Sequence, residues 1–289
     1  MKLGILSKVF VRLTVEAVLD AVAAAGVECV QLNLESAGLP PLPDEIPAEL
    51  AERICCAAGA RRIAIASVQG TFNMSHPDAG FRRQGLRRLR AIASACGQLG
   101  TSVIAICIGT RDRENMWRYH ADNDSPQAWH DMTACVGEAV EIARHAGLTL
   151  AFEPEVTNVV DSAQKARRLL DEIRSPHLKV TMDAANLFHT GELSRMAEVL
   201  DKAFALVGRE IVLAHAKDLS QDGEAGHEAA GHGRLDYDRY LSLLHACGFD
   251  GPLLLHGLAE SQVTGCVAFL RAKLARVAAA ASHPRDSAF

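Results

Sequence analysis

The sequence lacks the long apolar run that would carry it across a membrane. A bilayer-spanning helix needs roughly 18 or more consecutive apolar residues, and the chain contains no such stretch. The opening residues 1–6 break too early to form the hydrophobic core of a signal peptide. We therefore expect a cytoplasmic protein that has no membrane as a partner.

An excess of positive charge is also missing. The chain has 30 Lys and Arg residues against 35 Asp and Glu residues, which gives a net charge of −5. Proteins that coat nucleic acids or bind anionic lipid usually carry a basic surface that contacts phosphates. The sequence therefore predicts neither nucleic acid nor an anionic membrane as a partner.

Paired cysteines are a further absence. None of the 8 cysteines forms a C-x-x-C pair, the spacing that structural zinc sites often use. All of them have apolar neighbours: Cys29, Cys55, Cys56, Cys96, Cys107, Cys135, Cys247 and Cys266. The pattern argues against a disulfide framework and predicts reduced, mostly buried thiols.

Apolar residues, in contrast, are plentiful. They make up 49% of the 289 residues, while charged residues make up 22%, near the average for globular proteins. This composition excludes a disordered, collagenous or coiled-coil chain. No stretch rich in Pro, Ser and Gly divides the sequence, so we expect one domain over residues 1–278 and a C-terminal tail over residues 279–289.

Short β-branched runs alternate with longer helical patterns along the whole chain. The predicted strands are 2–6, 29–34, 62–68, 103–108, 148–152, 178–182, 210–214 and 252–255. The predicted helices are 15–25, 48–58, 81–99, 127–145, 163–173, 193–207, 237–246 and 261–277. Thr14 and Asp161 fit helix N-caps, and four glycines stand where helices should end: Gly26, Gly100, Gly147 and Gly248.

One helix after each of eight strands predicts an α/β protein, a single (β/α)8 TIM barrel, in a chain near the usual length of about 250 residues. A doubly wound open sheet is the alternative. It is disfavoured because Gly4-Ile5-Leu6-Ser7 stands where such folds often carry G-x-G-x-x-G after the first strand.

Two connections are longer than the usual 2–6 residues or so, namely 109–126 and 217–236. In a barrel, both would lie over the catalytic face at the C-terminal ends of the strands. The first holds a cationic set around an aromatic residue: Arg111, Arg113, Trp117, Arg118 and His120. We expect Arg111 and Trp117 to bind substrate, although a solvated loop or a contact in a homo-oligomer would use the same residues.

Polar residues end the last four predicted strands. Each follows an apolar run, about one βα unit after the previous one: Glu153, Asp183, His215 and His256. Any one of them could be a helix cap or a hydrogen-bonded core residue, but side chains on four adjacent strands converge at the barrel mouth. Two carboxylates and two imidazoles predict a divalent metal site, suited to Mn, Zn, Fe or Co and less typical of Mg.

At this point the chain resembles the xylose-isomerase-like TIM barrels of the sugar phosphate isomerase/epimerase superfamily. That superfamily includes ketose 3-epimerases, hydroxypyruvate isomerases, inosose dehydratases and metal-dependent abasic-site endonucleases. The resemblance is strongest in the second half, over segments 150–154, 182–187, 214–218, 231–237 and 248–252, and weaker over 75–78 and 95–101.

The resemblance implies that Glu153, Asp183 and His215 are metal ligands. The fourth family ligand is usually a Glu that ends the eighth strand, where this chain has His256. Family epimerases use the glutamates of the fifth and eighth strands as an acid/base pair, so this departure changes the available chemistry. Asn186 stands where sugar-binding members often have a His, and its amide still offers a donor and an acceptor to a hydroxyl.

Further residues could supply the missing acid/base function. Glu155 follows Glu153 at the same parity, and Glu260 lies at the start of the last predicted helix, where an acid also favours the helix dipole. Lys217 fits either an ion pair with Asp218 or a metal-ligand carboxylate, or a contact that stabilises an enolate oxygen.

His232, between two glycines in the 217–236 connection, fits substrate binding and simple exposure equally well.

We therefore predict a metal-dependent isomerase or epimerase whose substrate is a small carbohydrate, a sugar or keto-sugar with or without phosphate. Glu153, or Glu155 if Glu153 is committed to the ion, would abstract a proton to give an enediolate. A dehydratase or lyase that acts on a keto-sugar or cyclitol, and a non-catalytic sugar-binding barrel, are the alternatives. The acidic net charge disfavours the endonuclease branch.

Overall fold

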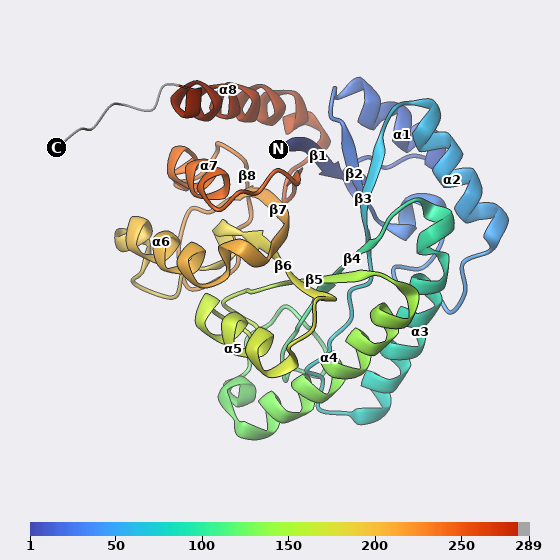
Figure 1. Ribbon diagram of the computed structural model, residues 1–289, viewed down its shortest axis with the longest axis vertical. Coiled ribbons are helices and arrows are strands. Elements are labelled where there is room, and N and C mark those ends of the chain that lie inside the picture. The colour runs from blue at the N-terminus through green and yellow to red at the C-terminus, as the bar shows by residue number, and fades with distance from the viewer. Residues whose placement is uncertain (283–289) are drawn as a thin grey trace.

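Eight parallel strands close into a barrel in the computed structural model, which describes residues 1–282 and, of 280–282, only the backbone (Figure 1). The barrel strands are β1 (Lys2–Leu6), β2 (Cys29–Leu32), β3 (Ala64–Gln69), β4 (Val103–Cys107), β5 (Thr149–Glu153), β6 (Leu178–Asp183), β7 (Ile211–Asp218) and β9 (Pro252–Leu255). Each pairs with its neighbour in chain order, and β9 pairs with both β7 and β1, which closes the ring.

Helices surround the barrel, one after each strand (Figure 1). They are α1 (Val15–Ala24), α2 (Ala48–Ala60), α3 (Ala79–Leu99), α4 (Pro126–Ala146), α5 (Ala163–Ile173), α6 (Met196–Val207), α7 (Tyr237–Ala246) and α8 (Val263–Ser282). The predicted single (β/α)8 TIM barrel is therefore confirmed. None of the helices in the described part of the chain is long and apolar enough to cross a membrane.

Short 3₁₀ turns connect several of these elements. They are η1 (Ser7–Val9), η2 (Leu34–Ala37), η3 (Ala121–Asp124), η4 (Ala184–Asn186), η5 (Leu193–Arg195), η6 (Gly208–Glu210) and η7 (Glu260–Gln262). Two of them occupy residues that the sequence pattern assigned to helices, because the first turns before α6 and α8 are tighter than an α-helix.

Apolar side chains fill both sides of the barrel wall. Most of the core lies between the strands and the helices, and a smaller cluster fills the barrel interior: Leu6, Cys29, Ala105, Ala151, Leu213 and Leu254. Small residues are needed where the strands converge. A Cβ on Gly4 would lie 2.5 Å from Cys29 Sγ and 2.7 Å from Leu254 Cδ2.

Helix ends follow the predicted capping residues with one correction. The Thr14 side chain accepts a hydrogen bond from the Ala17 N–H at the start of α1, as predicted. For α5, however, the N-cap is Ser162 and not Asp161. Asp161 instead forms an ion pair with Lys165 at 2.6 Å, which leaves the neighbouring hydroxyl to cap the helix. The four glycines expected at helix ends all have positive φ, between 68° and 80°.

The seventh strand extends beyond its predicted end. Lys217 and Asp218 continue β7 because they pair with a short antiparallel strand, β8 (Glu228–Ala229), within the 217–236 connection. The Asp218 carboxylate accepts backbone hydrogen bonds from Leu219, Gly231 and Leu235, and so holds this connection over the barrel.

The last helix enters the segment expected to be a tail. α8 continues to Ser282, so the first residues of the 279–289 segment are helical. Residues 283–289 of that predicted tail lie outside the described part of the chain.

The packing around Gly4 generates a stability prediction. Gly4→Ala should lower the free energy of unfolding by about 1–3 kcal/mol, because the added methyl meets the Cys29 backbone and the Leu254 side chain. Gly97→Ala is the matched control. Its Cβ would have no neighbour within 4 Å on an exposed turn of α3, so stability should rise by about 0.5–1 kcal/mol. Urea unfolding measures both, and equal effects would contradict this account of the barrel interior.

Candidate functional site

Three polar side chains meet at the C-terminal ends of neighbouring strands. Asp183 ends β6, His215 lies opposite it in β7, and His256 directly follows β9. One ligand atom from each lies within 4.8 Å of the others. The two imidazole rings stack at 22°, with centroids 5.1 Å apart. The strand-end pattern in the sequence thus brings these three residues together.

The polar atoms that face one another in this cluster have no hydrogen-bond partner. These atoms are Asp183 Oδ2, His215 Nδ1 and His256 Nδ1, all buried. The two ring nitrogens lie 3.6 and 3.9 Å from the carboxylate oxygen. Ligand atoms about 2.1 Å from a tetrahedral ion lie about 3.4 Å from each other, so the observed spacing fits a divalent transition metal. Buried ring nitrogens without hydrogen-bond partners, as in His215 and His256, are costly unless a ligand completes them.

Glu153, the remaining predicted ligand, lies beside this cluster. Its Oε2 is 3.5 Å from His215 Nδ1, while its Oε1 accepts a hydrogen bond from the Asn186 amide. Asn186 sits in η4 directly after β6, and it also donates to Glu155 Oε2 at 3.5 Å. The amide therefore links the two glutamates to the strand that carries Asp183.

A buried ammonium group adjoins the same carboxylate. Lys217 Nζ lies 3.2 Å from Asp183 Oδ2, and only 4% of the lysine side chain is exposed. Burial alone would favour the neutral amine, but Asp183 and Glu153 outweigh it and raise the pKa of Lys217. Of the two ion pairs considered for Lys217, the one with a metal-ligand candidate, Asp183, is therefore the one formed, and Asp218 is engaged elsewhere by backbone N–H groups.

The two histidines differ in protonation. Burial opposes a charge on His215, but the carboxylates of Glu153 and Asp183 outweigh it and raise the pKa of His215 to about 9. The pKa of His256 is well below its ordinary value because of burial and because Lys217 and His215 are cationic neighbours. His256 is thus a neutral imidazole, the form that binds metals, whereas His215 would have to release its proton to bind an ion.

Glu155 is a carboxyl group whose pKa is raised. Burial and the nearby charge of Glu153 raise the pKa of Glu155 to about 7. The Thr157 hydroxyl and the Asn158 amide donate hydrogen bonds to its Oε1, at 2.7 and 3.1 Å. A buried acid with a pKa near neutrality can both accept and donate a proton at physiological pH.

Two connected cavities open above these residues. The inner pocket, about 70 Å³, is lined by Glu153, Glu155, Asn186, His215 and His256, with the amides of Gln31 and Gln69 across the barrel. The outer chamber, about 1,030 Å³, is lined by residues that include Lys8, Trp117, Tyr119, Glu224, His227 and Leu258. Trp117, Lys8, Glu155 and His256 line both cavities.

Gln31 and Gln69 are site residues that the sequence reasoning missed. Each lies on a barrel strand among apolar residues. A polar side chain at such a position is the sequence signal that could have identified these two residues as part of the site. Ser67 donates to Gln31 Oε1 at 3.2 Å, and Asn33 donates to Gln69 Oε1, so both amides are fixed by neighbours.

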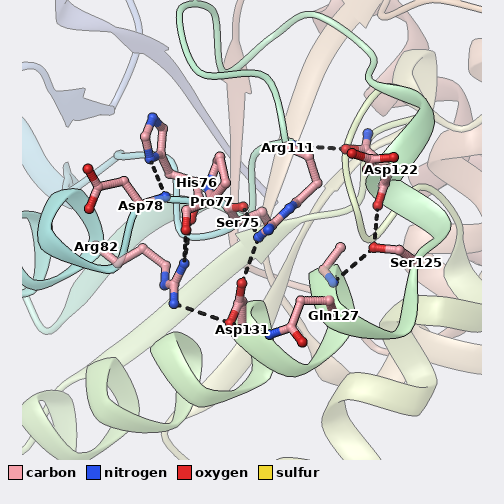
Figure 2. Close-up of polar contacts among 12 residues, drawn as sticks. Ser75, His76, Pro77, Asp78, Arg82, Arg111, Asp122, Ser125, Gln127 and Asp131 are labelled. Atoms are coloured by element: carbon pink, nitrogen blue, oxygen red, sulfur yellow. Dashed lines mark hydrogen bonds and ion pairs between the residues drawn. The ribbon is translucent and has the colours of Figure 1, made fainter.

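The arginine predicted to bind substrate has another partner. Figure 2 shows Arg111 and Arg82 directed at the Asp131 carboxylate, at 2.9 and 3.3 Å. Arg111 also donates to the Ser75 carbonyl. It lines a separate hollow of about 530 Å³ together with Arg113, Arg118 and His120. Within the described residues, the linings of the inner pocket and outer chamber include Trp117 but not Arg111.

The other candidates also lie away from the cluster. His232 is exposed and is absent from both linings among the described residues. Glu260 forms a two-pronged ion pair with Arg12. These placements leave Glu153, Glu155, Asn186 and Lys217 as the predicted residues gathered with the three strand-end ligands.

Comparison with known proteins gives a family match. The model of the xylose isomerase-like TIM barrel family matches residues 19–272. A ketose 3-epimerase of Arthrobacter globiformis is 26% identical over 133 residues, 45% of this chain and 42% of the relative. An L-ribulose-5-phosphate 3-epimerase of Escherichia coli is 25% identical over 195 residues, 68% of this chain and 63% of the relative. The matched part thus spans less than two thirds of these relatives.

Solved structures share the whole fold. An L-ribulose 3-epimerase superposes with a TM-score of 0.79 at 14% identity, covering 100% of this chain and 99% of the other. A 3-keto-D-glucoside 4-epimerase from E. coli superposes with a TM-score of 0.73 at 17% identity, covering 94% and 99%. At these identities the likeness establishes the barrel architecture.

The unpartnered atoms generate a metal-binding prediction. Asp183→Ala and His215→Ala should each weaken the binding of a divalent transition ion by at least about 100-fold, because water must complete the site. His256→Ala should weaken it as well, whereas His256→Glu should retain the ion through a carboxylate oxygen. Metal content after dialysis measures this, with the exposed His232→Ala as the control. Stoichiometric metal in the Asp183→Ala/His215→Ala double variant would contradict the assignment.

Proposed function

The chain belongs to the xylose isomerase-like TIM barrel family, and from this premise we propose that it is a metal-dependent sugar epimerase or isomerase. The named relatives, a ketose 3-epimerase and an L-ribulose-5-phosphate 3-epimerase, support a carbohydrate substrate. The observation that carries the proposal is the convergence of Asp183 Oδ2, ion-paired with Lys217, and two buried ring nitrogens of His215 and His256 that lack hydrogen-bond partners, next to a carboxyl group whose pKa is near 7.

The metal would be held by Asp183, His215 and His256, with Glu153 at the side of the cluster. When bound there, a divalent ion would polarise a carbonyl or hydroxyl oxygen of the sugar and make the neighbouring C–H more acidic. His256 cannot then act as a base, because its lone pair is committed as a ligand. The acid/base function therefore falls to a carboxyl group.

Glu155 is the best-placed proton carrier. It lines both the inner pocket and the outer chamber, and its pKa of about 7 lets it hold or release a proton near neutrality. We propose that Glu155 removes the proton from the carbon next to the substrate carbonyl, which gives an enediolate. Return of the proton to the neighbouring carbon isomerises the sugar, and return to the other face of the same carbon epimerises it.

Lys217 and Asn186 support this step. The Lys217 ammonium carries a positive charge in a site from which water is largely excluded, where it would stabilise negative charge on an enediolate oxygen. Asn186 donates to both glutamates and receives a hydrogen bond from the Gly226 N–H, which fixes its orientation. Its role is to position Glu155 relative to Glu153.

A dehydratase is the second candidate, and one observation favours it. His256 directly follows the eighth barrel strand where family epimerases carry a second glutamate, so the pair of glutamates that those epimerases use as acid and base is not present at these two positions. Elimination of a β-hydroxyl needs a base on one face only. Product analysis with a panel of keto-sugars separates the two functions, because only elimination loses water.

The role of Glu155 generates a prediction about rate and pH. Glu155→Gln should reduce solvent deuterium uptake at the substrate carbon by at least about 100-fold, since the amide cannot accept the proton. In the unaltered protein the rate should rise with pH through about 7, because Glu155 is the base only when ionised. Glu260→Gln, whose parent side chain pairs with Arg12, is the control and should keep both properties. Unchanged uptake in Glu155→Gln would rule out this base.

A further inference from the structure

The two cavities are very unequal in size. The inner pocket of about 70 Å³ has room for a few water-sized groups, enough for the reacting carbons and their oxygens. The outer chamber of about 1,030 Å³ reaches the upper end of the roughly 300–1,000 Å³ typical of small-molecule sites. Because they share the lining residues Trp117, Lys8, Glu155 and His256, the two cavities adjoin, and a ligand in the first would extend toward the second.

Two large aromatic residues face the outer chamber. Trp117 is 50% exposed and Tyr119 is 55% exposed, and both line the chamber. They are among the few large apolar side chains exposed in the described part of the protein, and core packing does not account for them. A flat ring with one polar group suits a ligand that has both apolar faces and hydroxyl edges, as a sugar ring does.

The segment that carries Trp117 is held in place before any ligand arrives. Asp112 Oδ1 accepts the N–H groups of Glu114 and Asn115, both at 2.9 Å, and Arg118 pairs with Asp112 Oδ2 at 2.6 Å. Asn115 Oδ1 then accepts the Trp117 N–H at 3.0 Å.

The base of this loop is fixed as well. The Arg111 ion pair with Asp131, drawn in Figure 2, joins the loop to α4. A loop backbone held in this way loses little conformational freedom on binding a ligand, which favours affinity.

The charges around the chamber disfavour a phosphate group. Arg111 and Arg118 are already paired with Asp131 and Asp112, so their guanidinium groups point to carboxylates and not to a ligand. Among the described residues that line the chamber, Lys217 is paired with Asp183, which leaves Lys8 as the cation without a carboxylate partner. Phosphate sites usually combine several cations or a helix N-terminus.

The helix that begins beside the chamber is also satisfied. Glu260 places a carboxylate in the turn that precedes α8, and this carboxylate already pairs with Arg12, so neither group is free to attract a phosphate. Gln262 Oε1 accepts the Ala259 N–H at 2.9 Å, so that donor is occupied.

We propose that the outer chamber is a subsite for a second, uncharged ring, so that the substrate is a keto-sugar joined to another sugar or to a ring-sized apolar group. The keto-sugar reaches the ligand cluster through the inner pocket, and the attached ring lies against Trp117 and Tyr119. This inference rests on the proposed function for the identity of the reacting unit. It assigns the substrate class: a neutral glycoside-like ketose and not a free or phosphorylated monosaccharide.

The chain offers a direct optical test, because it has 2 tryptophans. Trp129 lies on α4, donates to Glu172 and stacks under Arg168, apart from the cavities. Trp129→Phe therefore leaves Trp117 as the only tryptophan, whose fluorescence reports occupancy of the chamber without any turnover. The Zn²⁺-supplemented variant is titrated with fructose, fructose 6-phosphate and glucosyl-fructoses linked at different hydroxyls, including turanose, maltulose and isomaltulose.

At least one glucosyl-fructose should change the Trp117 emission saturably, with a dissociation constant about tenfold below that of fructose and of fructose 6-phosphate. In otherwise unaltered protein, Trp117→Ala and Tyr119→Ala should each reduce this preference about three- to tenfold by calorimetry. Trp129→Ala, the matched control, should keep it. The inference is overturned if every two-ring sugar binds no better than fructose, or if the phosphate ester binds best.

These readings are independent of the proposed reaction. Deuterium uptake tests the chemistry of Glu155, whereas the titration tests what the chamber holds. A two-ring preference without proton exchange would sustain the subsite and reject the epimerase or isomerase. Proton exchange that is equally fast with free and glycosylated ketoses, together with equal affinities for both, would sustain the epimerase or isomerase and reject the subsite.

Discussion

Asp183 and Lys217 carry opposite charges at the mouth of the barrel, with their charged atoms 3.2 Å apart and their side chains almost wholly removed from water. A buried charge is tolerated only where partners offset its lost hydration, and removal of one partner typically costs about 3–5 kcal/mol. The surrounding groups follow from this requirement. Lys217 and His215 hold the pKa of Asp183 below its ordinary value despite burial, and the Tyr240 hydroxyl, shared by the carbonyls of Met182 and His215, holds the two strands at that level.

The same cluster explains why the connections above it are so thoroughly bonded. Asn186 ties both glutamates to the turn after β6 and receives the Gly226 N–H from the connection after β7. The carboxylate of Asp218, directly after Lys217, accepts hydrogen bonds from backbone N–H groups of that same connection. Ligand side chains keep a useful geometry only when their backbone cannot shift, so the loops act as a support for the charged centre.

Much of this arrangement could be predicted from the sequence, because the order of the strands along the chain is also their order around the barrel. Asp183, His215 and His256 lie at or near the C-terminal ends of adjacent parallel strands, and parallel strands end at one face. Lys217 lies two residues beyond His215, on the same face of β7, which the alternation of a strand also implies.

Other features depend on which helix packs against which loop, and local patterns do not encode that choice. Arg111 was expected at the substrate because it is a cation in a mouth loop, but α4 brings Asp131 within 2.9 Å of it. The N-cap of α5 is a second case in which local pattern was not enough. Asp161 and Ser162 are both good capping residues, and Ser162 is the one that caps the helix, beside a contact between Lys165 and Asp124 from an earlier part of the chain. The pocket amides Gln31 and Gln69 lie on the neighbouring strands β2 and β3, and they share a pocket with Glu153 and His256 only after the barrel has closed.

The closure itself joins the two ends of the sheet. β1 pairs with β9 so that Lys2 lies against Pro252, and the first amino group forms an ion pair with Asp250. During synthesis β1 is made early and β9 very late. The backbone groups of β1 that pair with β9 therefore remain unpaired until β9 has emerged. Such an edge invites pairing with other chains, and contacts so distant in sequence form slowly. The ring that gives the site its rigidity therefore makes the nascent protein dependent on late folding, and a candidate client for chaperones.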